Sequence, residues 1–315
     1  MRPRPHNRPL PLACALLALL CCACAPAIRA AGGAPSIAAA TPQAVPVQVV
    51  VTSAPSAPPL PAASPSPAAA LRYDPLRLPA YAEEFLGPAS LAGYRALVEA
   101  IGAGAPSAAL PEGADYARIE RTLNALYPQK MLLYDARYTA GEGPLRYDAA
   151  TRTVSIRYAY DADTHRALMQ AFAARMDEAL SACTPGMTQR AQAEALYRFV
   201  VGHLHYELDM RLTVYDAVTT GAAYCQTYAG LYQLLLVQAG IENYLTAGRV
   251  DTDGDGKPDG DHQWNRLVLD GVSCYADPTW ERGDLTCFGM TYEQCVATGR
   301  LPPFLDPSDA LLDGA

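Results

Sequence analysis

Apolar and polar positions repeat along the chain with two different periods, which predicts a protein that mixes helices and strands. A spacing of three or four predicts helices over residues 90–101, 114–127 and 163–182. Strand-like runs are predicted over residues 131–138 and 145–160, the second with a spacing of two. We therefore interpret residues 72–184 as a small mixed α/β region, in which the sequence shows no recognisable chemistry.

The second half of the chain, residues 185–315, has stronger signals and is interpreted as a domain of its own. Thr188 is a typical N-cap for the helix whose apolar stripe follows it. Another helix is predicted from Cys225, after a run of small residues, to Gly240, a residue type that commonly ends helices. Cys225 therefore lies at or near a helix N-terminus, where backbone N–H groups and the helix dipole stabilise a thiolate.

A β-hairpin is predicted over residues 262–277. Asp270-Gly271 is a two-residue turn signal between two strand-like runs. A turn centred there places Trp264 opposite Asp277. His262 is two residues from Trp264, so His262 and Asp277 are diagonal neighbours on one face, about 7–8 Å apart at the backbone. A hydrogen bond between the imidazole and the carboxylate is within reach at that distance.

Cys225, His262 and Asp277 together supply the parts of a nucleophilic triad. The cysteine attacks, the histidine exchanges the proton, and the acid holds the histidine in one tautomer. Each residue alone has a simpler interpretation, as a buried or disulfide-bonded cysteine, a surface histidine or an acid at a strand end. Their order and spacing in one chain favour catalysis.

With these residues the chain resembles the transglutaminase-like superfamily of papain-related enzymes. The similarity covers about residues 190–282, including His262-Gln-Trp-Asn265 and Tyr275-Ala-Asp-Pro-Thr-Trp280. It implies an α+β fold with a papain/transglutaminase-like core, in which the N-terminal helices and the nucleophile helix pack on a small antiparallel sheet. It also implies that the cysteine is the nucleophile, with its backbone N–H in the oxyanion hole, that the histidine is general base and acid, and that the aspartate orients the histidine. The two tryptophans and the asparagine of these motifs are expected to be core and wall residues.

The segment before His262 is strongly acidic. Its spacing matches a calcium loop of the EF-hand type, with acids at positions one, three, five and nine and a glycine at position six. Position twelve, usually a glutamate, is His262, and Asp261 is the available substitute. The loop is expected either to bind Ca²⁺ or to be a solvated turn, and the candidate ligands are Asp251, Asp253, Asp255, Asp259 and Asp261. The triad itself requires no cofactor.

The first 71 residues have a different composition. Residues 1–30 join a basic start to an apolar run, which is typical of a secretory signal, and Cys24 near its end leaves a lipid-modified N-terminus open. Residues 31–71 contain no Asp, Glu, Lys or Arg and are rich in Ala, Pro and Ser, which predicts a disordered leader, with or without a tethering role. The chain is therefore predicted to be exported, either extracellular or tethered to the cell surface.

Charge and cysteine content add two further expectations. The formal net charge of −8 argues against nucleic acid or anionic lipid as the main partner, so membrane contact is expected only through the signal or a lipid anchor. Outside the cytoplasm, two disulfides are expected among four cysteines, with free thiols as the alternative. The simplest pair is Cys287 with Cys295, and the other two are Cys183 and Cys274. The sequence does not determine the oligomeric state.

Three functions fit these features. The favoured one is hydrolysis of a peptide or isopeptide bond through a thioester, because relatives with a short core of this kind resemble peptidases. A protein-glutamine transglutaminase would resolve the same acyl-enzyme with an amine, and the triad does not separate the two. The third is a catalytically idle surface or cell-wall binding module. The expected substrate is a peptide or protein, with cell-wall peptides among those that an exported enzyme can reach.

Overall fold

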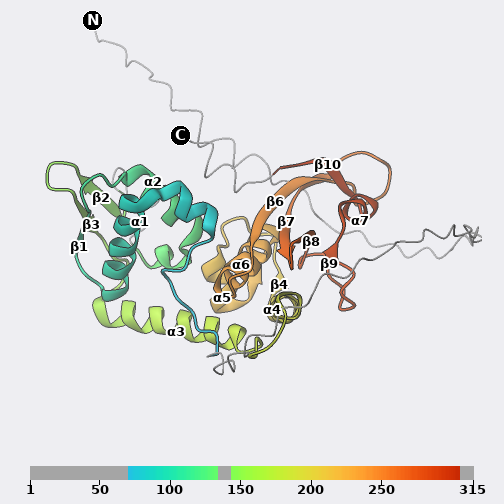
Figure 1. Cartoon of the computed structure of the whole chain (residues 1–315), viewed down its shortest axis with the longest axis horizontal. Helices are drawn as coiled ribbons and strands as arrows, with labels where there is room; N and C mark the ends of the chain where they lie inside the picture. Colours follow the sequence, from blue (N-terminus) through green and yellow to red (C-terminus); the bar gives the residue numbers. More distant parts are fainter. Residues whose placement is uncertain (1–69, 134–142, 306–315) are drawn as a thin grey trace, which may run out of the picture. The chain divides into compact units, whose positions relative to one another are not determined.

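The structure is a computed structural model that describes residues 70–133 and 143–305 (Figure 1). The predicted signal, nearly all of the predicted leader and residues 134–138 of a predicted strand lie outside the described residues. Among the helices that are described, none has the length and apolar character needed to cross a membrane.

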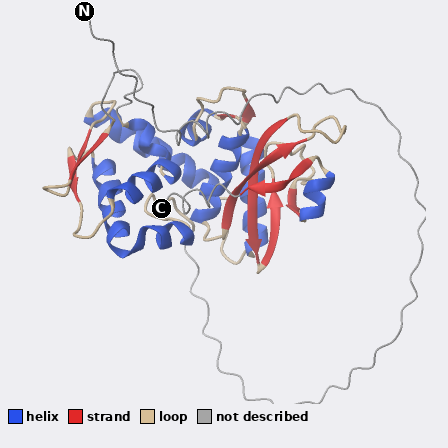
Figure 2. Ribbon diagram, turned by 90° about the horizontal axis from the view of Figure 1, so that it is seen from above, coloured by secondary structure: helices blue, strands red, loops and turns tan. Residues whose placement is uncertain are grey.

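The first part of the described chain is a helical layer with a small antiparallel sheet. Its strands lie in the order β1-β3-β2. Figure 2 shows this sheet and the larger sheet of the second part as two separate groups of strands. The elements are α1 (Ala80–Ala103), β1 (Ser107–Ala109), α2 (Tyr116–Leu126), the 3-10 helix η2 (Pro128–Leu132), β2 (Leu145–Asp148) and β3 (Thr153–Ile156).

Three predicted elements of this region need correction. The first two residues of the strand predicted over residues 131–138 belong to the 3-10 helix η2. The helix predicted over residues 90–101 begins ten residues earlier, and its two halves meet at a kink where Gly87 has a φ of 66° and Pro88 follows. The long strand predicted over residues 145–160 is a hairpin, because Asp148 accepts a hydrogen bond from the Ala150 N–H and turns the chain back. Alternation of apolar residues continues on both sides of such a turn, so the pattern alone does not reveal it.

The second part contains helices and a five-stranded antiparallel sheet with the order β10-β6-β7-β8-β9. The pair β4–β5 is parallel and separate from it. The helices are α3 (Ala162–Leu180), α4 (Gln189–His203), α5 (Val214–Thr220), α6 (Cys225–Gln238) and α7 (Tyr292–Ala297). The strands are β4 (His205–Tyr206), β5 (Ala222–Ala223), β6 (Asn243–Val250), β7 (Gly260–Leu269), β8 (Val272–Ala276), β9 (Phe288–Met290) and β10 (Arg300–Leu305).

Local signals explain most of these boundaries. Thr188 caps α4 by accepting a hydrogen bond from the Ala191 N–H, as predicted. The N-cap of α3 is Asp161, whose carboxylate accepts from the backbone N–H groups of the first turn. Gly240, with a φ of 71°, follows the last residues of α6 and confirms the predicted end of that helix.

The hairpin register is confirmed. Asp270 and Gly271 both have positive φ, as a type I′ turn requires, and Leu269 pairs with Val272. The pairing continues to Asn265 opposite Ala276, so the next position back places Trp264 opposite Asp277.

The two larger hydrophobic clusters hold most of these elements, and a smaller one contains Cys287, Met290 and Cys295. One of the two larger clusters joins α1 and α2 to the small sheet. The other packs α3, α4, α5 and α6 against the inner face of β7 and β8, with Leu235, Leu236 and Leu267 fully buried. The fold is therefore α+β, with α6 against an antiparallel sheet, as predicted.

Candidate active site

Cys225 is the first residue of α6 and is 8% exposed. A reciprocal cap fixes this helix end, because the Tyr224 N–H donates to Thr227 Oγ1 at 2.8 Å and the Thr227 N–H donates to the Tyr224 carbonyl at 3.0 Å. Before the cap, Gly221 has a φ of 82°, and a side chain there would meet the His203 carbonyl. The local structure thus places a thiol at a rigid helix N-terminus, where a thiolate is stabilised.

One hydrogen bond ties this helix to the strand that carries the histidine. Asn265 on β7 donates from Nδ2 to the Ala229 carbonyl on α6 at 2.9 Å, and both residues are fully buried. Ala229 is one turn along the helix from Cys225, and Asn265 is three residues along the strand from His262. Asn265 was expected only as a core residue. Its hydrogen bond fixes the position of α6 along β7.

His262 and Asp277 form the contact predicted from the hairpin. His262 Nε2 lies 2.8 Å from Asp277 Oδ2, and the two residues are 3% and 0% exposed. Because Nε2 faces the carboxylate, the donor in this bond is the Nε2–H, and Nδ1 is the nitrogen left to accept a proton. The geometry therefore selects one tautomer of the imidazole.

A cationic side chain holds the same carboxylate. Arg300 on β10 is fully buried, its Nε lies 3.2 Å from Asp277 Oδ2, and its Nη2 donates to the same oxygen. Burial alone would raise the pKa of the Asp277 carboxyl, but the charges of His262 and Arg300 and their hydrogen bonds outweigh it and hold that pKa well below its usual range. Asp277 is therefore an anion despite its burial.

Two aromatic rings enclose the histidine. The His262 ring stacks on Trp280 with centroids 4.8 Å apart and lies 5.8 Å from the ring of Trp264. Stacked indoles hold the plane of the imidazole ring. Sequence analysis treated both tryptophans as packing; the two-residue spacing of His262 and Trp264 was the signal that they share a face.

The chain after Asp277 is held by a buried carboxylate. Glu281 accepts backbone N–H bonds from four residues through Oε1 and from Cys287 through Oε2. The Tyr197 hydroxyl reaches both Glu281 Oε2, at 3.1 Å, and the Asp277 carbonyl, at 2.9 Å. These bonds fix the loop that positions Asp277, and sequence analysis found neither Tyr197 nor Glu281.

The acidic loop brings together three of the five predicted carboxylates. One oxygen from each of Asp251, Asp253 and Asp259 lies within 4.8 Å of the others. Asp255 instead pairs with Lys257 at 2.9 Å, and Asp261 lies on β7 and pairs with Arg249 at 3.2 Å. Hard oxygen donors on a tight loop suit Ca²⁺, but the candidate set is smaller than the spacing predicts.

The predicted disulfides are not present. None of the five described cysteines is in a disulfide, and all are buried: Cys183, Cys225, Cys274, Cys287 and Cys295. Cys183 and Cys274 pack in the core around α6, where they behave as small apolar residues. Burial raises the pKa of each of the four that were predicted to pair, for Cys295 to about 12. Apolar packing therefore accounts for residues that the sequence favoured as cystines.

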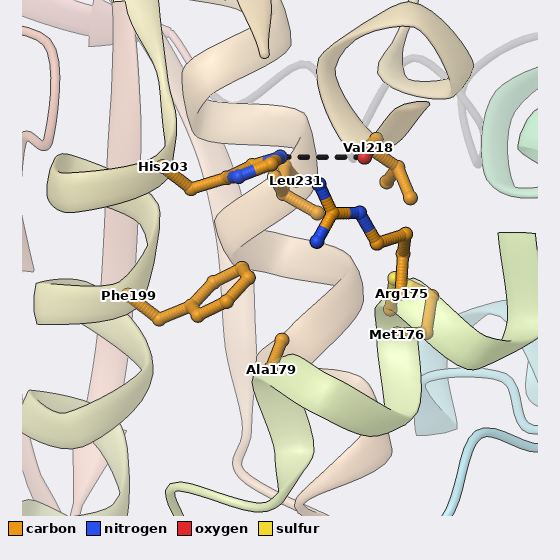
Figure 3. A pocket seen from close by; sticks show the side chains of 7 residues that line it. All are labelled: Arg175, Met176, Ala179, Phe199, His203, Val218 and Leu231. Carbon is orange, nitrogen blue, oxygen red and sulfur yellow. Dashed lines mark hydrogen bonds between the residues drawn. The ribbon is translucent and has the colours of Figure 1, made fainter. Parts of the chain in front are cut away.

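A shallow hollow lies away from these residues, among α3, α4, α5 and α6 (Figure 3). Its walls are mostly apolar, and His203 Nε2 faces the Val218 carbonyl at 3.3 Å across it. None of Cys225, His262 and Asp277 lines it, so it belongs to the packing of the helices.

Comparison with known proteins agrees with this site. Residues 177–279 match the family model of the transglutaminase-like superfamily, a range that includes Cys225, His262 and Asp277. Residues 177–279 are therefore a transglutaminase-like domain. No curated protein matches the chain.

Solved structures that are similar to part of the chain include a TGase and the periplasmic domain of TgpA from Pseudomonas aeruginosa. The TGase is 14% identical, with a TM-score of 0.30 over 56% of this chain and 51% of that one. The TgpA domain, bound to ethylmercury, is 20% identical, with a TM-score of 0.29 over 44% of this chain and 63% of that one. The chain thus spans less than two thirds of either relative.

Proposed function

We propose that this protein is a cysteine-dependent acyl-transfer enzyme that hydrolyses peptide or isopeptide bonds. Cys225 is the nucleophile, His262 is the general base and acid, and Asp277 orients the histidine. The observation that carries this proposal is the buried 2.8 Å bond between His262 Nε2 and Asp277 Oδ2, on a strand that Asn265 ties to the nucleophile helix.

The proposed reaction needs only these groups and water. Cys225 Sγ, having lost its proton to His262 Nδ1, attacks the amide carbonyl carbon to give a tetrahedral oxyanion, which the Cys225 backbone N–H helps to stabilise. The C–N bond breaks as the imidazolium gives its proton to the leaving amine, and a thioester remains. Water, deprotonated by His262, then attacks the thioester, releasing the carboxylic acid and the thiol.

The stacked tryptophans support the assignment of His262. The imidazolium that forms in the first step stacks with Trp264 and Trp280 and bonds the anionic Asp277. A charge that develops there is met by a fixed anion and two π faces, without the reorganisation that water would need.

Mass spectrometry of a glutamine-containing peptide tests the reaction and its acceptor. The enzyme is incubated with the peptide, with and without a primary amine. Hydrolysis predicts cleavage or deamidation in both samples; a product carrying the amine would identify a transglutaminase instead. Loss of turnover in Cys225→Ala, with Cys183→Ala as the matched buried-thiol control, ties the activity to this residue, whereas unchanged turnover in Cys225→Ala would contradict the proposal.

The acidic loop supports a second proposal, that Ca²⁺ orders the segment before His262. Asp251, Asp253 and Asp259 would supply the protein ligands, since their oxygens already converge. Bound calcium would offset the repulsion among three carboxylates and stabilise the loop between β6 and β7.

The location of the enzyme is also a proposal. The basic and apolar segment of residues 1–30 supports export, and a peptide or protein substrate outside the cytoplasm, cell-wall peptides included, follows from it. Fractionation of cells that express the full chain tests this: recovery of the uncleaved chain in the cytoplasm would contradict it.

A further inference from the structure

Arg300 is the one residue at the site that comes from β10, beyond the matched residues 177–279. Its guanidinium donates from Nε and Nη2 to Asp277 Oδ2, the oxygen that also bonds His262. We propose that Arg300 is a positioning residue, which aims the Asp277 carboxylate at His262 and so fixes the imidazole for catalysis. This inference rests on the proposed function.

The guanidinium is itself immobilised. Nη1 donates to Thr298 Oγ1 at 2.6 Å, and the plane lies 4.6 Å over the ring of Trp280. The same indole stacks on His262 at 4.8 Å. A planar fork with fixed donors transmits its orientation to a carboxylate, which a flexible ammonium group does less well. Arg300 and His262 are thus held by one ring and one carboxylate.

Both oxygens of Asp277 are engaged. Oδ2 meets His262 and Arg300, and Oδ1 accepts from the backbone N–H groups of Thr279 at 3.1 Å and Trp280 at 3.4 Å. Without Arg300, the fully buried carboxylate would keep His262 as its only side-chain partner, and burial favours the neutral acid or a rotated group. Either change would weaken the hydrogen bond that fixes the tautomer of His262. Arg300 therefore acts on the histidine through Asp277.

A merely structural ion pair would look similar in a stability measurement, so the test uses catalytic rates. Arg300→Met and Arg300→Lys are compared with wild type on a peptide that wild type cleaves, at a temperature where all variants are folded. Arg300→Met is expected to lower kcat about 10- to 100-fold with KM changed less than about 3-fold, as for partners that orient a catalytic ligand. The matched control is Arg249→Met, which removes an exposed arginine of the neighbouring strand β6 and is expected to keep wild-type kcat.

Arg300→Lys keeps the positive charge but loses the planar set of donors of the guanidinium. If Arg300→Met does not fold, Arg300→Lys alone tests the positioning role. It is expected to lower kcat about 3- to 10-fold, less than Arg300→Met, while the protein remains folded. Wild-type kcat in a folded Arg300→Lys or Arg300→Met variant would overturn the inference.

A double-mutant cycle tests whether Arg300 acts through Asp277. In an Asp277→Asn background, Arg300→Met is expected to cost less than about 3-fold further, since coupled residues are non-additive. A full additional loss would show that Arg300 acts independently of the aspartate and would overturn the inference.

Nuclear magnetic resonance of the ¹⁵N-labelled His262 ring separates this inference from the proposed function. Wild type is expected to carry the proton on Nε2, and Arg300→Met to show mixed tautomers. If wild type has the fixed tautomer but no turnover, the proposed function fails and the positioning role stands. If wild type turns over and Arg300→Met keeps the fixed tautomer, the positioning role fails and the function stands.

Discussion

The Tyr197 hydroxyl donates to the main-chain carbonyl of Asp277 at 2.9 Å, across 80 residues of sequence. This bond ties α4 to the end of β8, at the residue proposed to orient His262. Helix α4 therefore supports the site as well as the core.

Tyr197→Phe is expected to lower both stability and activity. Loss of the hydroxyl removes the Tyr197 donor from the buried Asp277 carbonyl and one of the hydrogen bonds to Glu281, which costs about 1–3 kcal/mol. The looser Asp277 backbone should reduce kcat several-fold. Urea denaturation and kinetic assays measure the two effects.

Tyr232→Phe is the matched control for that change. Its hydroxyl is also buried and donates to the Ala193 carbonyl at 2.9 Å, away from Asp277. A similar loss of stability with unchanged kcat is expected, and an equal loss of kcat in both variants would refute a specific role for Tyr197.

The low pKa of Asp277 predicts how the free energy of unfolding depends on pH. Its pKa in the folded protein lies below the unfolded value of about 3.9. The ionised group therefore stabilises the fold fully above about pH 4, and this stabilisation is lost as pH falls further. Wild type should be more stable than Asp277→Asn at pH 7, and the difference should shrink between pH 5 and pH 3. A constant difference in the free energy of unfolding across this range would disprove the buried anion.

The cysteines predict a simple count of thiols. A chain truncated to residues 70–305 should have five alkylated thiols when it is unfolded without reductant and treated with an alkylating reagent. The five are Cys183, Cys225, Cys274, Cys287 and Cys295. A mass corresponding to three or one alkylated residues would show disulfides that the structure lacks.

Calcium should raise the melting temperature if the acidic loop binds it. Excess Ca²⁺ against a chelator should shift wild type upwards, and Asp251→Asn should abolish the shift because Asp251 is in the convergent set. Asp255→Asn is the control, since Asp255 pairs with Lys257 instead. An identical melting temperature with calcium and with chelator would remove the proposal.

The hairpin contact was predictable because its information is local. Asp270 and Gly271 fix the turn, and a strict period of two carries the register back to His262 and Asp277. The cap of α4 and the end of α6 were equally local. The starts of elements were harder to predict. Helix α1 extends across Gly87 and Pro88, residue types that usually interrupt a helix.

Arg300 was not predictable by the same means. It belongs to β10, which pairs with β6, so no turn or period relates it to Asp277 on the far side of β7. Only the structure shows that Arg300 is fully buried and therefore needs an acidic partner. The acidic loop shows a different limit of sequence patterns. Spacing alone does not reveal that Asp255 pairs with Lys257 and that Asp261 pairs with Arg249.

The central claim is that Cys225, His262 and Asp277 act as one unit, and the rate of alkylation of Cys225 tests it most directly. Wild type and His262→Gln are treated with iodoacetamide near neutral pH, and labelling of Cys225 is followed by mass spectrometry. The account predicts that wild type reacts faster than a free cysteine and that His262→Gln reacts at least about 10-fold more slowly than wild type, since the thiolate loses its partner. Equal rates in the two folded proteins would contradict it.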